Sequence, residues 1–194
     1  MAPARIIIGI SGASGALYGV NALRLARASG VETHLVVSRA ALLTLHQEMG
    51  IQKSDLTSMA DIVHSASDVG ASIASGSFKT MGMLIAPCSV KTLSEIASGV
   101  TSTLMSRAAD VILKERRRLV LMLRETPLHL GHLKSMTAVT EMGAIVMPPV
   151  PAFYSHPASI DEMVNHSVGR ALDLFDIETG VVKRWQGLKA QTDQ

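Results

Sequence analysis

The sequence predicts one α/β domain in which a mostly parallel sheet is covered by helices on both faces. Short, β-branched apolar runs alternate with stretches of helical spacing, which is typical of buried parallel strands joined by crossover helices. The 194 residues fit one domain, and no linker, repeat or low-complexity segment divides them. Apolar residues make up 47% of the chain, enough for a large core. We therefore expect a single three-layer, doubly wound domain over residues 1–194, with a C-terminal tail from about residue 176.

Five apolar runs are predicted to be strands. Residues 6–10 are nearly all isoleucine and contain one glycine, which favours a strand buried on both faces. The other four runs have the same short length and apolar character. The five predicted strands are residues 6–10, 31–37, 83–86, 119–123 and 144–147.

Helical spacing follows each predicted strand. The clearest example is an apolar stripe through Leu17 and Leu23 that stops at Gly30. Further helices are predicted through residues 41–50, 89–97, 104–118, 133–143 and 159–172. The helix from residue 104 is expected to end in the basic residues 116–118, which complement the helix dipole. Ser159 and Glu162 have the spacing of a capping box.

Residues 51–80 carry the weakest pattern. Asp55 is expected to cap a helix that runs through Met59 and Ile62. Residues 71–79 are small and polar, so we expect a loop there.

Composition excludes several classes of protein. The formal net charge is only +2, which argues against nucleic acid or an anionic membrane as a partner. One cysteine, Cys88, forms no intrachain disulfide, and no apolar run approaches the length of a membrane span. The N-terminal residues lack the long apolar stretch of a signal peptide, so we expect a soluble cytoplasmic protein. The seven histidines show no compact set of metal ligands, and we expect no metal; His129 and His132 are predicted to lie on a helix surface.

Candidate ligand-binding residues follow the predicted strands. Ligands of parallel sheets bind beyond the carboxyl ends of the strands, where the following helices begin. The segments at that edge are residues 9–15, 38–39, 87–92, 124–127 and 148–154. They are rich in glycine, small hydroxyl residues and cations, which suits a phosphorylated ligand.

The first of these segments, residues 9–15, suits phosphate best. Its glycines allow close approach of the backbone, the next helix begins with exposed amides, and Ser14 adds a hydroxyl. The spacing is not G-x-G-x-x-G and no acidic residue is placed for a ribose, which disfavours NAD. Ser89 and Thr92 open a second helix N-terminus of the same kind. Tight packing of strand against helix is the alternative explanation for the glycines.

Charged and aromatic residues suggest further roles, each with a plainer alternative. Arg124 and Glu125 can bind an anionic substrate and move protons, or can form an ion pair that closes a loop. Arg107 and Lys114 share a helix face and can act together on a ligand, but a helix face exposed to solvent also explains two cations at this spacing. Residues 148–154 predict a stiff aromatic lip over a ligand, or a hydrophobic plug. Cys88 is predicted to pack in the core rather than react.

Seven ordered motifs resemble the UbiX family of flavin prenyltransferases, nearly throughout the chain. The motifs are G-x-S-G-A-S-G at 9–15, A-S-G-S-F at 74–78, P-C-S-V-K-T at 87–92, R-A-A-D-V at 107–111, L-K-E-R-R at 113–117, R-E-T-P at 124–127 and M-P-P-V-P-A-F-Y at 147–154. The resemblance implies a flavodoxin-like Rossmann fold, often assembled as a dodecamer with sites at subunit interfaces. It also implies metal-independent transfer of the dimethylallyl group of dimethylallyl phosphate to N5 and C6 of reduced FMN. The product, prenylated FMN, is implied to serve a UbiD-type decarboxylase, for example in ubiquinone biosynthesis.

The same resemblance implies roles for individual residues. The FMN-binding residues would be Gly12, Ala13, Ser14, Ser38, Ser89, Val90, Lys91, Thr92 and Arg124. Those that bind dimethylallyl phosphate would be Tyr154, Arg170, Arg107 and Lys114. Those that take part in catalysis would be Glu125, Ser14, Glu48, Lys114 and Trp185.

Two other functions remain open at the level of sequence. One is an FMN-dependent decarboxylase of the phosphopantothenoylcysteine type, which is disfavoured because Lys91 stands where that group has asparagine. The other is a flavin carrier without catalytic activity. The sequence does not distinguish a phosphate from a pyrophosphate donor, or identify the decarboxylase that would be served.

Overall fold

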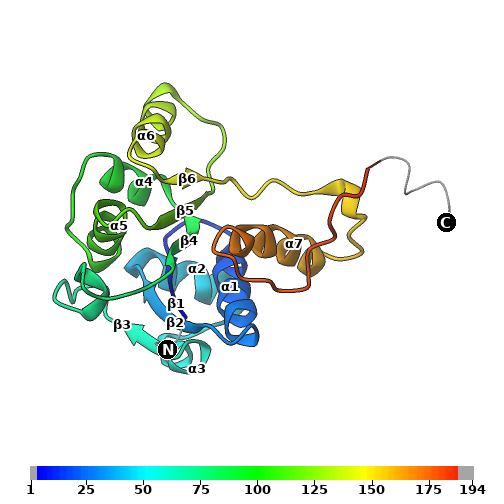
Figure 1. Cartoon of the computed structure of the whole chain (residues 1–194), viewed down its shortest axis with the longest axis horizontal. Helices are drawn as coiled ribbons and strands as arrows, with labels where there is room; N and C mark the ends of the chain where they lie inside the picture. The colour runs from blue at the N-terminus through cyan, green and yellow to red at the C-terminus, as the bar shows by residue number, and fades with distance from the viewer. Residues whose placement is uncertain (1–3, 188–194) are drawn as a thin grey trace.

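A six-stranded sheet, parallel throughout, forms the centre of the structure, a computed structural model that describes residues 4–187 (Figure 1). The strands are β1 (Arg5–Ile10), β2 (Glu32–Val37), β3 (Ile62–His64), β4 (Gly82–Cys88), β5 (Arg118–Leu123) and β6 (Ile145–Val146). They stand in the order β3-β2-β1-β4-β5-β6. The order reverses between β1 and β4, so the carboxyl ends of these two strands flank the switch point at which doubly wound proteins bind ligands.

All five predicted strands are present, and the doubly wound fold class is confirmed. Taken alone, these five have the strand order of a flavodoxin. The sixth strand, β3, was not predicted: Ile62 was expected on a helix and instead begins a strand that pairs with β2. The helix before it, α3 (Leu56–Met59), is one turn long, and Asp55 makes no side-chain cap to it.

Six longer helices cover the two faces of the sheet. They are α1 (Ala16–Ala28), α2 (Arg39–Met49), α4 (Val90–Ala97), α5 (Leu104–Lys114), α6 (Leu130–Glu141) and α7 (Ile160–Asp173). Short 3-10 helices occur at Lys53–Asp55, Ser72–Ala74 and Phe153–Ser155. Within residues 4–187, no helix is long and apolar enough to cross a membrane.

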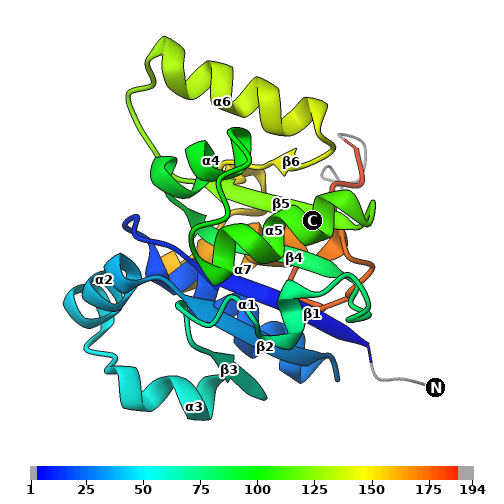
Figure 2. The ribbon, with the colours of Figure 1, turned by 90° about the vertical axis from the view of Figure 1, so that its left-hand side faces the viewer.

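Alternate side chains of β1 point to opposite faces of the sheet and anchor the helices on each face. Ile6, Ile8 and Ile10 face a core that includes side chains of α1, α2 and α7. Ile7 faces the opposite core, to which α4, α5 and α6 contribute. Figure 2 shows α5 on the near side of the strands. Because β1 is buried on both faces, a continuous apolar run is the pattern that this position requires.

One helix end and one helix cap differ from the expectation. The helix predicted to end in residues 116–118 ends at Lys114, and Arg118 is the first residue of β5. Arg116 has φ +56°, a left-handed conformation that ends the helix. Ser159 caps α7 by accepting a hydrogen bond from the Glu162 amide, but the Glu162 carboxylate accepts from the Ala158 amide, so the expected capping box is only half formed.

The C-terminal segment, residues 176–187, runs back along α7 (Figure 1). Ile177 is buried in the core. A Cβ on Gly169 of α7 would lie 2.7 Å from a Val182 methyl group, so the absence of a side chain at residue 169 permits this close packing. The remainder of the predicted tail, residues 188–194, lies outside the described residues.

Candidate functional site at the carboxyl edge of the sheet

Backbone hydrogen bonds hold the loops after four strands side by side. The Ser38 amide donates to the Ile10 carbonyl at 3.0 Å, which joins the ends of β1 and β2. The Arg124 amide donates to the Cys88 carbonyl at 3.0 Å, which joins β4 and β5. The loops that carry Ser14, Ser38, Ser89 and Arg124 therefore lie at one edge.

Ser11 joins the two strands at the switch point. Its side chain is fully buried, and its hydroxyl donates to the Pro87 carbonyl at 2.9 Å while accepting from the Ser89 amide at 2.7 Å. A buried hydroxyl with both capacities satisfied fixes the loop after β1 against the loop after β4. Sequence reasoning gave Ser11 no role, although a hydroxyl directly after a buried apolar strand was the available signal.

Glu48 occupies the N-terminus of α1, where the sequence suggested exposed amides. Its carboxylate accepts from the Gly15 amide at 2.9 Å and from the Ala16 amide at 2.9 Å. Partial burial raises the pKa of Glu48, but hydrogen bonds from Ser14 and these two amides, together with Arg124, hold it below its usual value overall. Glu48 is therefore an anion at neutral pH, held at the positive end of a helix.

Two glycines allow this loop to pack closely. Gly15 has φ +97°, which a residue with a side chain rarely adopts, and a Cβ there would lie 3.2 Å from Cδ of Arg124. A Cβ on Gly12 would lie 2.3 Å from that of Ala40, at the start of α2. The loop is thus packed between α2 and Arg124. Burial raises the pKa of Tyr18 above its usual value, and the charge of Arg124 partly opposes this rise.

Three helix N-termini meet at this edge, those of α1, α2 and α4. Ser38 caps α2 by accepting from the Ala41 amide at 3.1 Å, and Ser89 caps α4 by accepting from the Thr92 amide at 3.3 Å. Val90 and Lys91 form the first turn of α4, and Lys91 pairs with Glu95 at 2.7 Å. Converging helix N-termini and Arg124 favour a phosphorylated ligand.

Glu125 extends from the same edge. It is exposed, and the one hydrogen bond described for its carboxylate comes from the amide of its neighbour Thr126, at 3.0 Å. A carboxylate with so few protein partners is free to bind a substrate proton.

A second group of predicted site residues lies on α7 and on the segments beside it. The ring of Tyr154 packs edge-on against Trp185, with centroids 5.6 Å apart, and against His166 at 5.8 Å. Arg170 lies one turn beyond His166 and pairs with Asp173 at 2.7 Å. Figure 1 shows the segment between β6 and α7 extending away from the sheet. Phe153, beside Tyr154, is 71% exposed, so in one chain this aromatic lip is uncovered.

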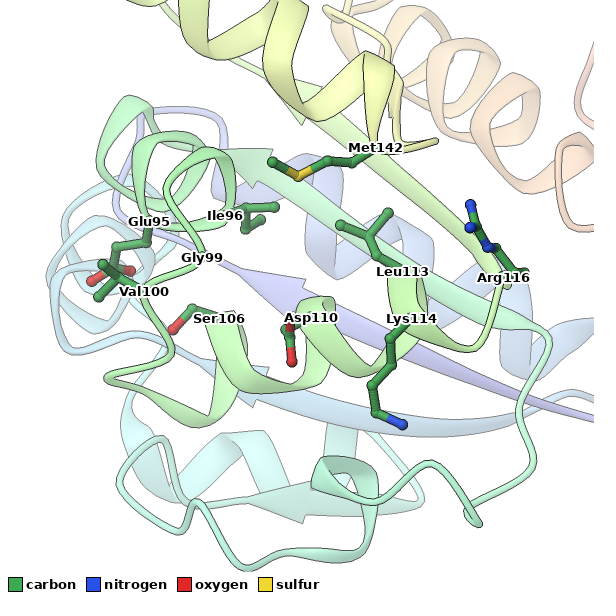
Figure 3. Close-up of a pocket in the computed structure, with 10 residues that line it drawn as sticks. All are labelled: Glu95, Ile96, Gly99, Val100, Ser106, Asp110, Leu113, Lys114, Arg116 and Met142. Atoms are coloured by element: carbon green, nitrogen blue, oxygen red, sulfur yellow. The ribbon is translucent and has the colours of Figure 1, made fainter.

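Arg107 and Lys114 form a third group, on α5. Arg107 pairs with Asp110 at 2.9 Å, and Lys114 pairs with Glu115. A surface pocket of about 600 Å³ adjoins them; its lining includes Glu95, Ser106, Asp110, Leu113, Lys114, Arg116 and Met142 (Figure 3). In Figure 3 the Lys114 side chain extends away from Met142.

One chain does not bring Lys114 to the edge that holds Arg124 and Glu125. Lys114 ends α5 just before the amino end of β5, whereas Arg124 follows its carboxyl end. A strand rises about 3.3 Å per residue, so Arg118 and Arg124 are about 20 Å apart along β5. Lys114 can therefore take part in a site at that edge only if a neighbouring subunit contributes it.

The two histidines predicted on a helix surface lie at the start of α6. Nδ1 of His129 accepts from the Gly131 amide at 3.0 Å and so caps α6, while its ring stacks on His132 at 3.6 Å. Within residues 4–187, no group of three or more His, Cys, Asp or Glu side chains is arranged to hold a metal ion.

Cys88 is expected to resist alkylation in the folded protein. It is fully buried at the end of β4, and burial raises the pKa of its thiol to about 12, so almost no thiolate is present at pH 8. Iodoacetamide at pH 8, followed by intact mass, should therefore label the unfolded chain in urea but not the native chain. Rapid labelling without urea would show an accessible thiol at the site.

The fold and this edge define an α/β protein suited to a phosphorylated ligand at the switch point of its sheet. Residues 1–186 match the flavoprotein family. The flavin prenyltransferase UbiX of Thauera aromatica is 55% identical over 183 residues, covering 94% of each chain. The chain therefore belongs to the flavoprotein family and, within it, to the UbiX flavin prenyltransferases.

Two solved structures extend the comparison. AnUbiX (PadA1), in complex with FMN and dimethylallyl pyrophosphate, matches with a TM-score of 0.93 and 49% identity, covering 95% of this chain and 98% of that one. A dodecameric FMN-dependent UbiX-like decarboxylase from Escherichia coli O157:H7 matches with a TM-score of 0.91 and 47% identity, covering 94% of this chain and all of that one. The likeness thus extends over nearly the whole chain.

Proposed function

We propose that this protein transfers the dimethylallyl group of dimethylallyl phosphate to N5 and C6 of reduced FMN. The observation that carries the proposal is the carboxyl edge of the sheet, where the N-termini of α2 and α4, Arg124 and the free carboxylate of Glu125 meet. The high identity to a flavin prenyltransferase supports it. So does the complex of AnUbiX with FMN and dimethylallyl pyrophosphate.

The edge has the properties that FMN requires. The loop at Gly12, Ala13 and Ser14 permits close approach, and the starts of α2 and α4 present amides for a phosphate. Glu48 already satisfies the amides at the start of α1, so the FMN phosphate is assigned to the other two helices. The residues proposed to bind FMN are Gly12, Ala13, Ser14, Ser38, Ser89, Val90, Lys91, Thr92 and Arg124. Reduced FMN, when bound, supplies the two ring atoms that accept the prenyl group.

Cationic and aromatic side chains of this chain fit the second substrate. Departure of phosphate from an allylic carbon leaves a delocalised cation. Arg170, Lys114 and Arg107 would stabilise the departing phosphate, while the rings of Tyr154 and Trp185 would face the allyl cation. This chemistry depends on positioning and electrostatics, and it needs no metal and no nucleophile from the protein.

Glu125 and Glu48 are proposed to have different tasks. Bond formation at N5 releases a proton, and ring closure at C6 takes up one proton on the prenyl chain and releases another. Glu125, which extends freely from the edge, and the released phosphate would transfer these protons. Glu48 is bound to the start of α1 and close to Ser14, so it would hold this loop and its hydroxyl in place.

The arrangement of the three groups supports an assembly in which neighbouring subunits complete each site. We propose a dodecamer, the state named for the UbiX-like protein of Escherichia coli O157:H7. The exposed lip at Phe153 and the α5 cations at Arg107 and Lys114 would then lie at subunit interfaces. We further propose that the product, prenylated FMN, passes to a UbiD-type decarboxylase, and that the protein acts in the cytoplasm.

Anaerobic incubation with reduced FMN and dimethylallyl phosphate tests this function. The flavin is extracted and its mass measured; attachment of the C5 unit at both ring positions gives one heavier flavin. Parallel reactions with dimethylallyl pyrophosphate and with no donor identify the donor. Tight FMN binding without any heavier flavin would support a carrier, and carbon dioxide release from phosphopantothenoylcysteine would support the decarboxylase alternative.

A further inference from the structure

Asp173, at the end of α7, binds two arginines at once. Its Oδ2 accepts from Arg170 at 2.7 Å and from Arg184 at 2.9 Å, and its Oδ1 accepts from Arg184 at 3.0 Å. The Asp173 side chain is only 14% exposed, whereas both arginines are about half exposed. One nearly buried carboxylate thus anchors two side chains whose outer faces remain open.

The two arginines lead to different parts of the proposed substrate site. Arg170 is a proposed ligand of the donor phosphate. Arg184 immediately precedes Trp185, whose ring packs against Tyr154. The two hydrogen bonds from Arg184 to Asp173 are a fork that fixes the orientation of the guanidinium as well as its position.

Other contacts tie the same segment to its surroundings at Lys183. Its Nζ donates to the Ser155 carbonyl at 3.0 Å, and its carbonyl lies 3.3 Å from Nε2 of His166. These contacts hold the backbone near Trp185, but neither involves the charge of Arg184. Figure 1 shows this segment beside α7 and reaching the lip that carries Tyr154.

We propose that Asp173 is a positioning residue for the dimethylallyl phosphate site: it orients Arg170 toward the phosphate and, through Arg184, holds Trp185 against Tyr154. The inference rests on the proposed function and assigns to Asp173 and Arg184 roles that the sequence did not suggest. Two cations on one carboxylate leave a net charge of +1 to attract a phosphate ester.

Asp173 is ionised at neutral pH. Partial burial raises the pKa of its carboxyl, but hydrogen bonds and charge interactions with Arg184 and Arg170 outweigh this effect and keep the pKa below its usual value. Asparagine has the same shape but cannot accept from both guanidinium groups in this way. Asp173→Asn therefore removes the negative charge and one of the two acceptor oxygens with little change in volume.

The only tryptophan in the sequence is Trp185, so intrinsic fluorescence reports on this segment directly. The test compares the parent with Asp173→Asn, Arg184→Gln, Arg170→Gln and Asp173→Glu. The control is Asp176→Asn. Asp176 lies three residues after Asp173, and its well exposed carboxylate pairs with Arg118 instead. Each variant is examined for acrylamide quenching of Trp185 and, by calorimetry with oxidised FMN bound, for affinity to dimethylallyl phosphate.

Asp173→Asn is expected to increase quenching of Trp185 about two-fold and to weaken dimethylallyl phosphate about 10-fold or more, with FMN affinity unchanged. Arg184→Gln should reproduce the quenching, and Arg170→Gln should reproduce the loss of affinity without the quenching. Asp173→Glu should restore part of both effects, and Asp176→Asn should behave as the parent.

The outcomes separate this inference from the proposed function. Unchanged Trp185 quenching and unchanged donor affinity in Asp173→Asn would overturn the inference, whatever the enzyme makes. A change in quenching alone would overturn the link to Arg170. Failure of the parent to form a heavier flavin would overturn the proposed function, while the quenching measurements would still show whether Asp173 holds Trp185.

Discussion

Glu125→Gln is expected to slow formation of the flavin adduct by about 10²- to 10⁴-fold, the usual contribution of a positioned acid or base, while FMN affinity stays within about two-fold of the parent. The carboxylate of Glu125 accepts one described hydrogen bond, from the adjacent Thr126 amide, and a glutamine oxygen can accept the same bond. The substitution therefore removes a proton acceptor without disturbing the edge. Single-turnover mixing with reduced FMN, followed by mass analysis of the flavin, measures the rate.

The matched control is Glu141→Gln, an equally conservative change at an exposed carboxylate near the end of α6. It should leave both adduct formation and FMN binding as in the parent. Equal rates for Glu125→Gln and the parent would remove Glu125 from the proton transfers. A large loss of FMN affinity would instead assign Glu125 to flavin binding.

The central strands were predictable because their surroundings impose a simple pattern. A strand covered on both faces, such as Arg5–Ile10, must be apolar at nearly every position. The edge strand Ile62–His64 is only three residues long and Ile62 is exposed, so no such requirement applies and the apolar spacing resembled a helix. Local sequence therefore identified the centre of the sheet but not its margin.

The candidate site was predictable to the same extent. The rule that ligands bind beyond the carboxyl ends of strands placed Ser14, Ser89 and Arg124 at one edge without any structure. Glu48 binds the start of α1, at a residue 33 positions earlier in the chain. This contact depends on how α2 packs against α1, and no local sequence pattern encodes that packing. The pairing of Asp173 with Arg184 likewise depends on a C-terminal segment that folds back along α7.

Mixed assemblies of two inactive variants should recover activity if neighbouring subunits complete each site. Lys114 lies at the amino end of β5 and Glu125 beyond its carboxyl end, about 20 Å away, so one subunit cannot direct both at the same substrate. Lys114→Ala and Glu125→Gln should each be nearly inactive alone. In a random equal mixture of subunits, about one quarter of the sites would combine an intact Glu125 with an intact Lys114 from a neighbour.

The experiment co-expresses the two variants with different affinity tags and purifies assemblies that carry both. Adduct formation per site should reach about one quarter of the parental value by this counting. Glu48→Gln and Arg124→Gln form the matched control pair, because both residues adjoin the α1 N-terminus of the same subunit. Every subunit in that mixture has one altered residue at its own edge, so mixing cannot restore an intact edge. Recovery by the first pair but not the second places Lys114 at a neighbour's site; no recovery by verified mixed assemblies removes Lys114 from any site shared between subunits.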